Sequence, residues 1–265
     1  MDTLILKLVL TPALIGAASL AGRRWGPTVS GWLVGLPLTS GPVVFFLALN
    51  HGAAFAAAAA VGTLTGTLAE CAFCLPYAWL ARRFGWPLAL GVGIFGFLAA
   101  TLALQYLVLP LLLLFLLIIV ALTLTLRLMP QGSGAAQKAG PPPRWDIPAR
   151  MVVATAFVLL LTGAASALGP RLTGLLAPFP LYASILSVFA HRLQGSAAAA
   201  GVLRGLLLGL FSFASFFLVL ASLIGRAGIA PAFAVAIGVA LVIQAGALWV
   251  LRRPARRQER QRSEV

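Results

Sequence analysis

The stretch GLPLTSGP, Gly35 to Pro42, lies inside an apolar run that is long enough to cross a membrane. Pro37 and Pro42 interrupt a helix there, because proline lacks a backbone N–H and its ring clashes with the preceding turn. In hydrocarbon, a backbone group without a partner is costly unless protein, water or a ligand bonds to it. The interruption therefore predicts either a kink that neighbouring helices satisfy or a binding site.

The same interruption recurs in the second half of the chain, at APFPLYAS, Ala177 to Ser184. The sequence aligns with itself at one constant offset and without a gap, so that Gly26–Leu38 matches Gly169–Leu181. The matched pairs are Gly26/Gly169, Pro27/Pro170, Gly31/Gly174, Pro37/Pro180, Phe46/Phe189, Gly52/Gly195, Gly62/Gly205, Gly66/Gly209, Phe73/Phe216 and Gly85/Gly228. Apolar composition produces coincidences of glycine and proline less readily than coincidences of leucine and alanine. We therefore predict an internal duplication.

Composition identifies the class of protein, because 61% hydrophobic residues, 9% charged residues and a mean hydropathy of +1.04 exclude a soluble globular domain. Apolar segments of about 20 residues predict spanning helices and lack the alternation of barrel strands. The sequence predicts an all-α polytopic membrane protein with nine transmembrane helices. The predicted spans are Leu4–Ala21, Thr28–Asn50, Ala53–Ala81, Trp86–Leu107, Leu109–Leu128, Pro148–Leu168, Leu172–Leu193, Ala197–Leu223 and Ile229–Leu251.

The nine spans divide into two repeats of four helices and one connector helix. The predicted divisions are 1–108 for the first repeat, 109–147 for the connector and a Pro/Gly-rich linker, 148–251 for the second repeat, and 252–265 for a basic tail. We expect neither the linker nor the tail to form regular structure. A single connector inverts the second repeat, and inverted repeats recur in secondary transporters, where they alternate access to one site.

The distribution of basic residues predicts the orientation. With the N-terminus outside, all of the 19 Lys and Arg residues except Lys7, Arg171 and Arg226 fall on the cytoplasmic side, where basic residues are retained. The net charge of +14 then reflects topology, and we expect no nucleic-acid partner. We expect a protein of the bacterial inner membrane with a cytoplasmic C-terminus, whose partners are lipids and a small-molecule substrate. A homo-oligomer is left open.

The two interruptions mark the predicted site. Pro37 and Pro180 both fall near the middle of a ~30 Å hydrocarbon core, at ~1.5 Å per residue, and paired midplane breaks point to a transport site. We expect the breaks to face each other and to bind a small polar or amphipathic solute, with an anionic one favoured by helix N-termini. The candidate substrate-binding residues are Pro37, Thr39, Ser40, Gly41, Pro180, Tyr182, Ser184, Arg204 and Gln244.

Glu70 is the one acid within a predicted span, about 18 Å along its helix from the cytoplasmic edge at ~1.5 Å per residue. A charged carboxylate is expensive at that depth, so an intramembrane acid is a functional residue by default and Glu70 is the candidate proton carrier. The alternative is a protonated carboxyl that only bonds neighbouring helices, since Phe213 occupies the matching position. Arg204 either extends to the interface or pairs with Glu70 or an anionic substrate.

Two further motifs concern packing. Gly62 and Gly66 match Gly205 and Gly209, and small residues four apart predict that the third and eighth spans approach closely. Cys71 and Cys74 lack the second ligand pair of a zinc site, and we expect neither a metal nor another cofactor.

These features favour a secondary transporter, with proton coupling through Glu70. The alternatives are a lipid or prenyl-phosphate flippase, a passive channel, or a lipid-processing enzyme within the membrane. The sequence contains no aspartate-rich diphosphate motif and no H-E-x-x-H, so an enzyme is not expected.

Overall fold

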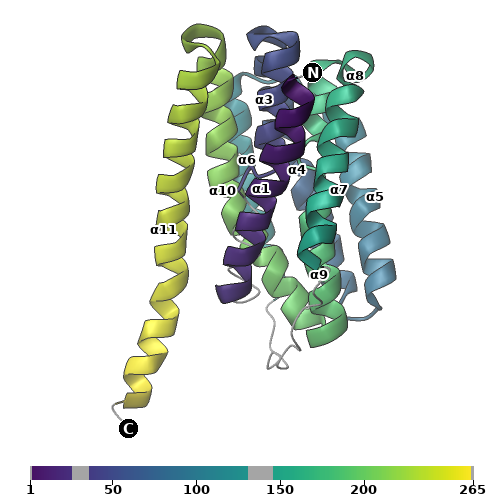
Figure 1. The fold of residues 1–265 in the computed structure, drawn as a ribbon. Coiled ribbons are helices and arrows are strands. Elements are labelled where there is room, and N and C mark those ends of the chain that lie inside the picture. The colour runs from purple at the N-terminus through teal and green to yellow at the C-terminus, as the bar shows by residue number, and fades with distance from the viewer. Residues whose placement is uncertain (1, 26–35, 131–145, 264–265) are drawn as a thin grey trace.

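The structure is a computed structural model that describes residues 2–25, 36–130 and 146–263. Every regular element in these ranges is an α-helix, which confirms the all-α class (Figure 1). The helices are α1 Asp2–Trp25, α3 Ser40–His51, α4 Ala53–Leu80, α5 Trp86–Leu104, α6 Leu111–Leu128, α7 Asp146–Gly163, α8 Ala165–Leu176, α9 Leu181–Gln194, α10 Ser196–Ala227 and α11 Ile229–Ser263. The termini lie at opposite ends of the bundle.

Five of these helices are long and apolar enough to cross a membrane, namely α4, α5, α6, α10 and the first part of α11. A sixth span results if α8 and α9, which meet at a bend of 44°, are counted together. The apolar parts of α1 and α7, Leu4–Gly16 and Ile147–Gly163, are shorter. The chain is thus consistent with an integral membrane protein. The count of nine remains a prediction, and part of the predicted span Thr28–Asn50 lies outside the described residues.

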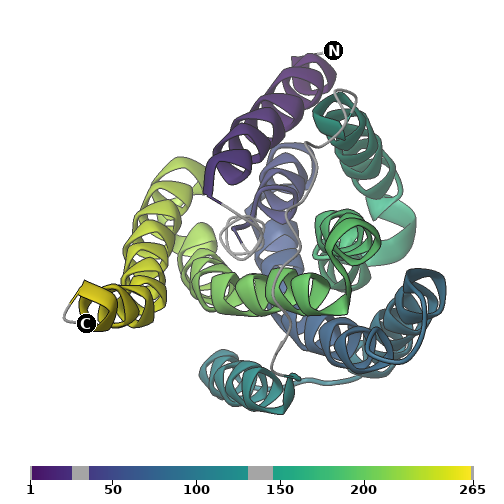
Figure 2. The same cartoon turned by 90° about the horizontal axis from the view of Figure 1, so that it is seen from below.

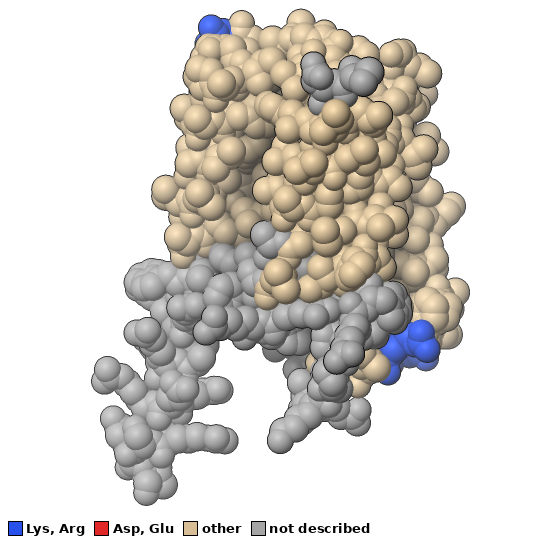
Figure 3. Space-filling view, viewed as in Figure 1, with Lys and Arg blue, Asp and Glu red and all other residues tan. Residues whose placement is uncertain are grey.

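The helices form an inner group and an outer ring. Seen from below, α3, α4, α9 and α10 lie at the centre, and α1, α7, α5, α6 and α11 surround them (Figure 2). Within their most apolar stretches, α4 is 72% buried and α10 is 61% buried, against 22% for α5 and for α6. On the face seen in Figure 3, the Lys and Arg side chains among the described residues lie near the two ends. An apolar belt between charged ends is what a bilayer requires.

Two boundaries test the sequence directly. The predicted separation of the fourth and fifth spans is confirmed, because α5 ends at Leu104 and α6 begins at Leu111. The Arg171 guanidinium donates to the carbonyl oxygen of Leu107 in this connection. The tail was predicted wrongly, since α11 continues as a helix to Ser263. Arginine, glutamine and glutamate are good helix formers, and a helix already under way needs no new nucleation.

The two interruptions have the same backbone hydrogen bonds. In the first, Leu38 N donates to Leu36 O at 2.7 Å, and Gly41 N donates to Pro37 O at 2.8 Å. The aligned bonds of the second are Leu181 N to Phe179 O at 2.7 Å and Ser184 N to Pro180 O at 2.8 Å. Each break is therefore a tight turn around its proline that leads straight into a new helix, α3 or α9.

Other aligned positions also agree in geometry. Gly52 ends α3 with φ 85° and ψ 172°, and Gly195 ends α9 with φ 87° and ψ 176°, in a region that favours glycine. The buried residues of α5 and α11 also occupy aligned positions. They are Ala89, Gly93, Phe97 and Thr101 in α5 and Ala232, Ala236, Ala240 and Gln244 in α11. In Figure 1, α3 lies towards the upper end of the bundle and α9 towards the lower end.

The close glycine contact forms with a different partner from the one expected. Helix α4 does pack against α10, but Gly62 and Gly66 face α8. A Cβ at Gly62 would lie 2.5 Å from the carbonyl oxygen of Arg171, and one at Gly66 would lie 2.5 Å from Cγ of Pro178. Small residues allow another helix to pack closely, but the sequence does not show which helix does so.

Candidate functional site

A small cavity of about 30 Å³ lies where the two interruptions meet. Thr39 and Ser40 of the first break line it, together with Pro180 and Tyr182 of the second. Glu70 of α4 and its aligned counterpart in α10, Phe213, also line it. The space is enough for one small polar group. The structure thus brings together two breaks and one acid that are far apart in sequence.

Two helix N-termini open onto this cavity. Helix α3 begins at Ser40 and α9 begins at Leu181, and both residues line the space. The N-terminus of a helix carries partial positive charge, and here the turns already bond Gly41 N of α3 and Leu181 N of α9. Neither helix has a side-chain cap at this end. The cavity therefore favours an acceptor or a negative charge.

Glu70 is buried, with 5% of its surface exposed. Its Oε2 atom has no hydrogen-bond partner among the described residues. A buried polar atom left without a partner costs about 1–3 kcal/mol, so such an atom beside a cavity is a natural contact for a bound group. Glu70 is the one acid among the buried side chains that the structure describes.

The hydroxyl groups at the breaks hold the lining in place. Ser40 Oγ donates to the carbonyl oxygen of Ala177 at 2.9 Å, which ties the start of α3 to the end of α8. Tyr182 OH donates to the carbonyl oxygen of Arg150 at 3.4 Å, which ties α9 to α7. The two interruptions are thus cross-linked to each other and to an outer helix.

Some of the residues expected at the site lie elsewhere. Arg204 does not line the cavity, and its guanidinium donates to Leu126 O at 3.3 Å and Pro130 O at 3.4 Å, near the C-terminal end of α6. That end carries partial negative charge, which explains the position of the cation. Of the alternatives given for Arg204, pairing with Glu70 and placement in the site are therefore not what the structure shows, and the side chain bonds the end of α6 instead.

Ser184 and Gln244 also lie outside the lining. Ser184 Oγ is a buried atom on α9 without a hydrogen-bond partner among the described residues, and Gln244 is buried on α11. Pro37 and Gly41 line a second and larger cavity. Sequence reasoning recognised the breaks but could not tell which side of each turn faces which space.

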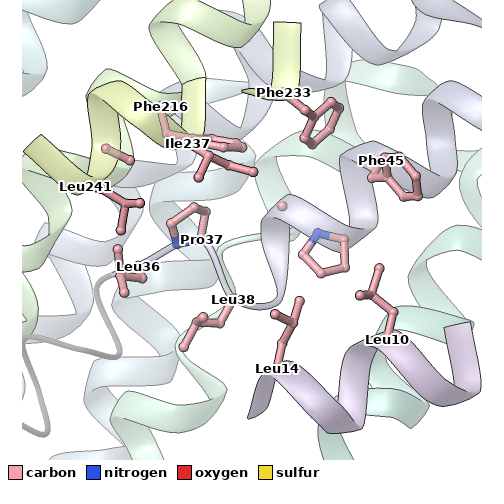
Figure 4. Close-up of a pocket in the computed structure, with 13 residues that line it drawn as sticks. Leu10, Leu14, Leu36, Pro37, Leu38, Phe45, Phe216, Phe233, Ile237 and Leu241 are labelled. Carbon is pink, nitrogen blue, oxygen red and sulfur yellow. The ribbon is translucent and has the colours of Figure 1, made fainter. Parts of the chain in front are cut away.

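The larger cavity, of about 470 Å³, lies between α1, α3 and α11, and we term it the lateral groove. It is lined by Leu14 of α1, by Pro37 and Gly41 at the first break, and by Ile237 and Ala240 of α11, all of them apolar. Figure 4 shows side chains of the three segments around one common space, with Pro37 on one side of it and Leu10 and Leu14 on another. A hollow between α11 and α1 opens it to the lateral face of the molecule (Figure 3).

Two buried cations were missed by the sequence analysis. Lys7 was expected among the basic residues outside the membrane, yet it is 8% exposed within α1. Its Nζ donates to Thr162 Oγ1 of α7 at 2.9 Å and lies 5.4 Å from the ring centroid of Phe46. The residue aligned with Lys7 is Arg150, which is also 8% exposed. A basic residue at both positions of the alignment was the signal that could have identified them.

No protein-family model, no curated protein and no solved structure matches this chain.

Proposed function

We propose that the chain is a secondary transporter of the inner membrane, built from two inverted repeats, with its substrate site at the meeting point of the two interrupted helices. The observation that carries the proposal is the small cavity in which Ser40, Tyr182 and Glu70 come together. Broken helices near the middle of a membrane protein are tolerated where they line a cavity, and they form the binding sites of several transporter folds.

The agreement between the two halves supports the inverted repeat. The hydrogen bonds at the breaks, the glycine angles at Gly52 and Gly195, and the buried residues of α5 and α11 all recur at aligned positions. Helices α3 and α9 lie towards opposite ends of the bundle, and α6 packs against both α4 and α10. A connector in contact with both central helices, at a crossing between repeats, suits a rocking motion of one repeat against the other.

Proton coupling follows from the place of Glu70. A protonated Glu70 donates a hydrogen bond into the cavity, and an ionised Glu70 accepts one and adds negative charge. Burial disfavours a charge on Glu70 when the cavity is empty, and the two helix N-termini favour an anionic substrate when Glu70 carries a proton. Substrate and proton would therefore bind together.

The test is proton flux in liposomes that hold the purified protein and a pH-sensitive dye. A panel of small carboxylates, amino acids, phosphate esters and fatty acids is added outside, under an imposed pH gradient. We expect one class of solute to increase proton entry, and we expect the Glu70→Gln variant to remove that increase. Flux that is equal in the variant and the parent protein would contradict the proposal.

A lipid flippase is the second candidate, because the lateral groove opens towards the lipid. The two functions differ in energetics. A proton-driven transporter accumulates its substrate against a gradient, and a protonophore abolishes that accumulation. A passive flippase equilibrates a fluorescent lipid between leaflets and does not respond to the protonophore.

A further inference from the structure

The positions that line the lateral groove have aligned counterparts elsewhere in the chain, and the space at those counterparts is filled. Leu14, Leu36 and Ala240 of the groove align with Phe157, Phe179 and Phe97. These three rings are packed together, with centroids 5.5 Å apart for Phe97 and Phe179 and 6.0 Å apart for Phe157 and Phe179. Aromatic side chains thus close the space between α5, α7 and the second break, whereas the aligned space between α11, α1 and the first break stays open.

The lateral groove adjoins the small cavity beside Glu70, which we term the polar cavity. Leu36 lines both spaces, so the first break separates them by the thickness of one turn. Pro37 and Gly41 face the lateral groove, and Thr39 and Ser40 face the polar cavity. A single molecule with an apolar tail and a polar end can therefore occupy both.

We propose that the substrate is a single-chain amphiphile with a carboxylate head group, such as a long-chain fatty acid, whose chain lies in the lateral groove and whose head lies beside Glu70. This assignment rests on the proposed function and names the chemical class of its substrate. The apolar lining matches the chain, and the volume of about 470 Å³ exceeds what a small polar solute needs. The lateral opening lets the chain enter from the bilayer.

The head group is recognised by proton sharing. Protonated Glu70, whose Oε2 has no partner among the described residues, donates a hydrogen bond to the carboxylate. The N-termini of α3 and α9 stabilise the remaining negative charge. When Glu70 loses its proton the two carboxylates repel each other, so release of the proton promotes release of the substrate. The number of protons and charges is conserved throughout, since one proton and one carboxylate move together.

The probe is a palmitate analogue with a diazirine in its alkyl chain, added to the purified full chain in nanodiscs. On irradiation, we expect cross-links to peptides of α1 and α11 that border the groove, and competition by unlabelled palmitate. The double variant Leu14→Phe/Ala240→Phe copies the filled counterpart, and it should reduce this labelling at least about tenfold. The matched control, Val9→Phe/Val242→Phe, adds the same rings on the exposed faces of α1 and α11 and should label as the parent does.

The outcomes separate the inference from the proposed function. Labelling that survives in the filled variant, or that palmitate does not compete, would overturn the inference, because ordinary lipid contact would account for it. If proton flux depends on Glu70 while labelling is not specific, the transporter stands and the amphiphile fails. If labelling is specific and no solute drives proton flux, the groove stands and proton-coupled transport fails.

Should the double variant not fold, as shown by its elution and thermal unfolding, Gly41→Leu serves as the second variant, since a Cβ there meets only ordinary contacts at 3.6 Å.

Discussion

The two halves of the molecule share a backbone plan and differ in the side chains that fill it. Both contain a proline turn followed by a new helix, and both end that helix at a glycine with nearly the same angles. Glu70 of the first half and Phe213 of the second occupy one aligned position, whereas the open lateral groove and the filled aromatic cluster are each built from both halves. Duplication would thus provide the scaffold, and divergence at a few positions would leave one acid and one open groove.

The largest effect is expected from removing the acid that only one half possesses. Glu70→Gln keeps the size of the side chain and its hydrogen bonding but cannot exchange a proton at neutral pH. We expect proton-coupled flux to fall to the level of protein-free liposomes. Thr65→Val on the same helix is the control, because Thr65 Oγ1 bonds only to Val61 O within α4. Equal flux in Glu70→Gln and Thr65→Val would remove the functional difference between the halves.

The aromatic cluster offers the next largest effect. Phe97→Ala removes a fully buried ring, and a change of this kind costs about 3–5 kcal/mol of stability. The aligned change in the opposite direction, Ala240→Phe, enters the space of the lateral groove and should cost much less. Thermal unfolding of both variants in one detergent measures the difference. Equal losses would mean that the groove is not free space, and the contrast between the halves would disappear.

Much of this arrangement could be predicted from the sequence, but the asymmetry could not. Pro37 and Pro180 stand out because proline has a direct backbone effect, and the turn at residues 105–110 stands out because one helix cannot extend through forty apolar residues of bilayer, roughly twice the usual span. The lateral groove depends on the packing of Leu36 or Phe179 with two other segments. Such three-way contacts leave no local periodic signal.

The contact partners of long side chains and of glycines were also not predicted from the sequence. The flexible stem of Arg204 allowed several partners, and only the structure shows that the side chain reaches the end of α6. Gly62 and Gly66 predicted a close contact with another helix, but they did not identify α8 as that helix. Lys7 was counted with the basic residues of the outer side, and its burial against Thr162 of α7 was not predicted.

A smaller effect is expected at the buried cations, which test whether the halves remain equivalent. Lys7→Met removes a hydrogen bond to Thr162 and a contact with the ring of Phe46. Bonds of this kind within membrane proteins contribute about 0.6 kcal/mol on average and at most about 1.7 kcal/mol. We expect a loss in this range in Lys7→Met, and a loss of similar size in Arg150→Met. Unfolding in a mild detergent provides the measurement, and losses that differ by more than this range would show that the two positions have diverged.

The smallest effect is expected at the hydroxyl that joins the two breaks. Ser40→Ala removes the bond to the carbonyl oxygen of Ala177, at about 0.6 kcal/mol on average for such bonds in membrane proteins. The residue aligned with Ser40 is Ala183, which is also buried, so the second half already lacks this hydroxyl. If the bond serves mainly to hold the polar cavity in shape, Ser40→Ala should leave the unfolding temperature almost unchanged and weaken palmitate-probe labelling of α1 and α11. Ser222→Ala on α10 is the matched control, because its exposed hydroxyl bonds only to Leu218 O of its own helix. Labelling that falls equally in both variants would assign the loss to general stability, whereas a loss confined to Ser40→Ala would place the hydroxyl in the substrate site of the first half.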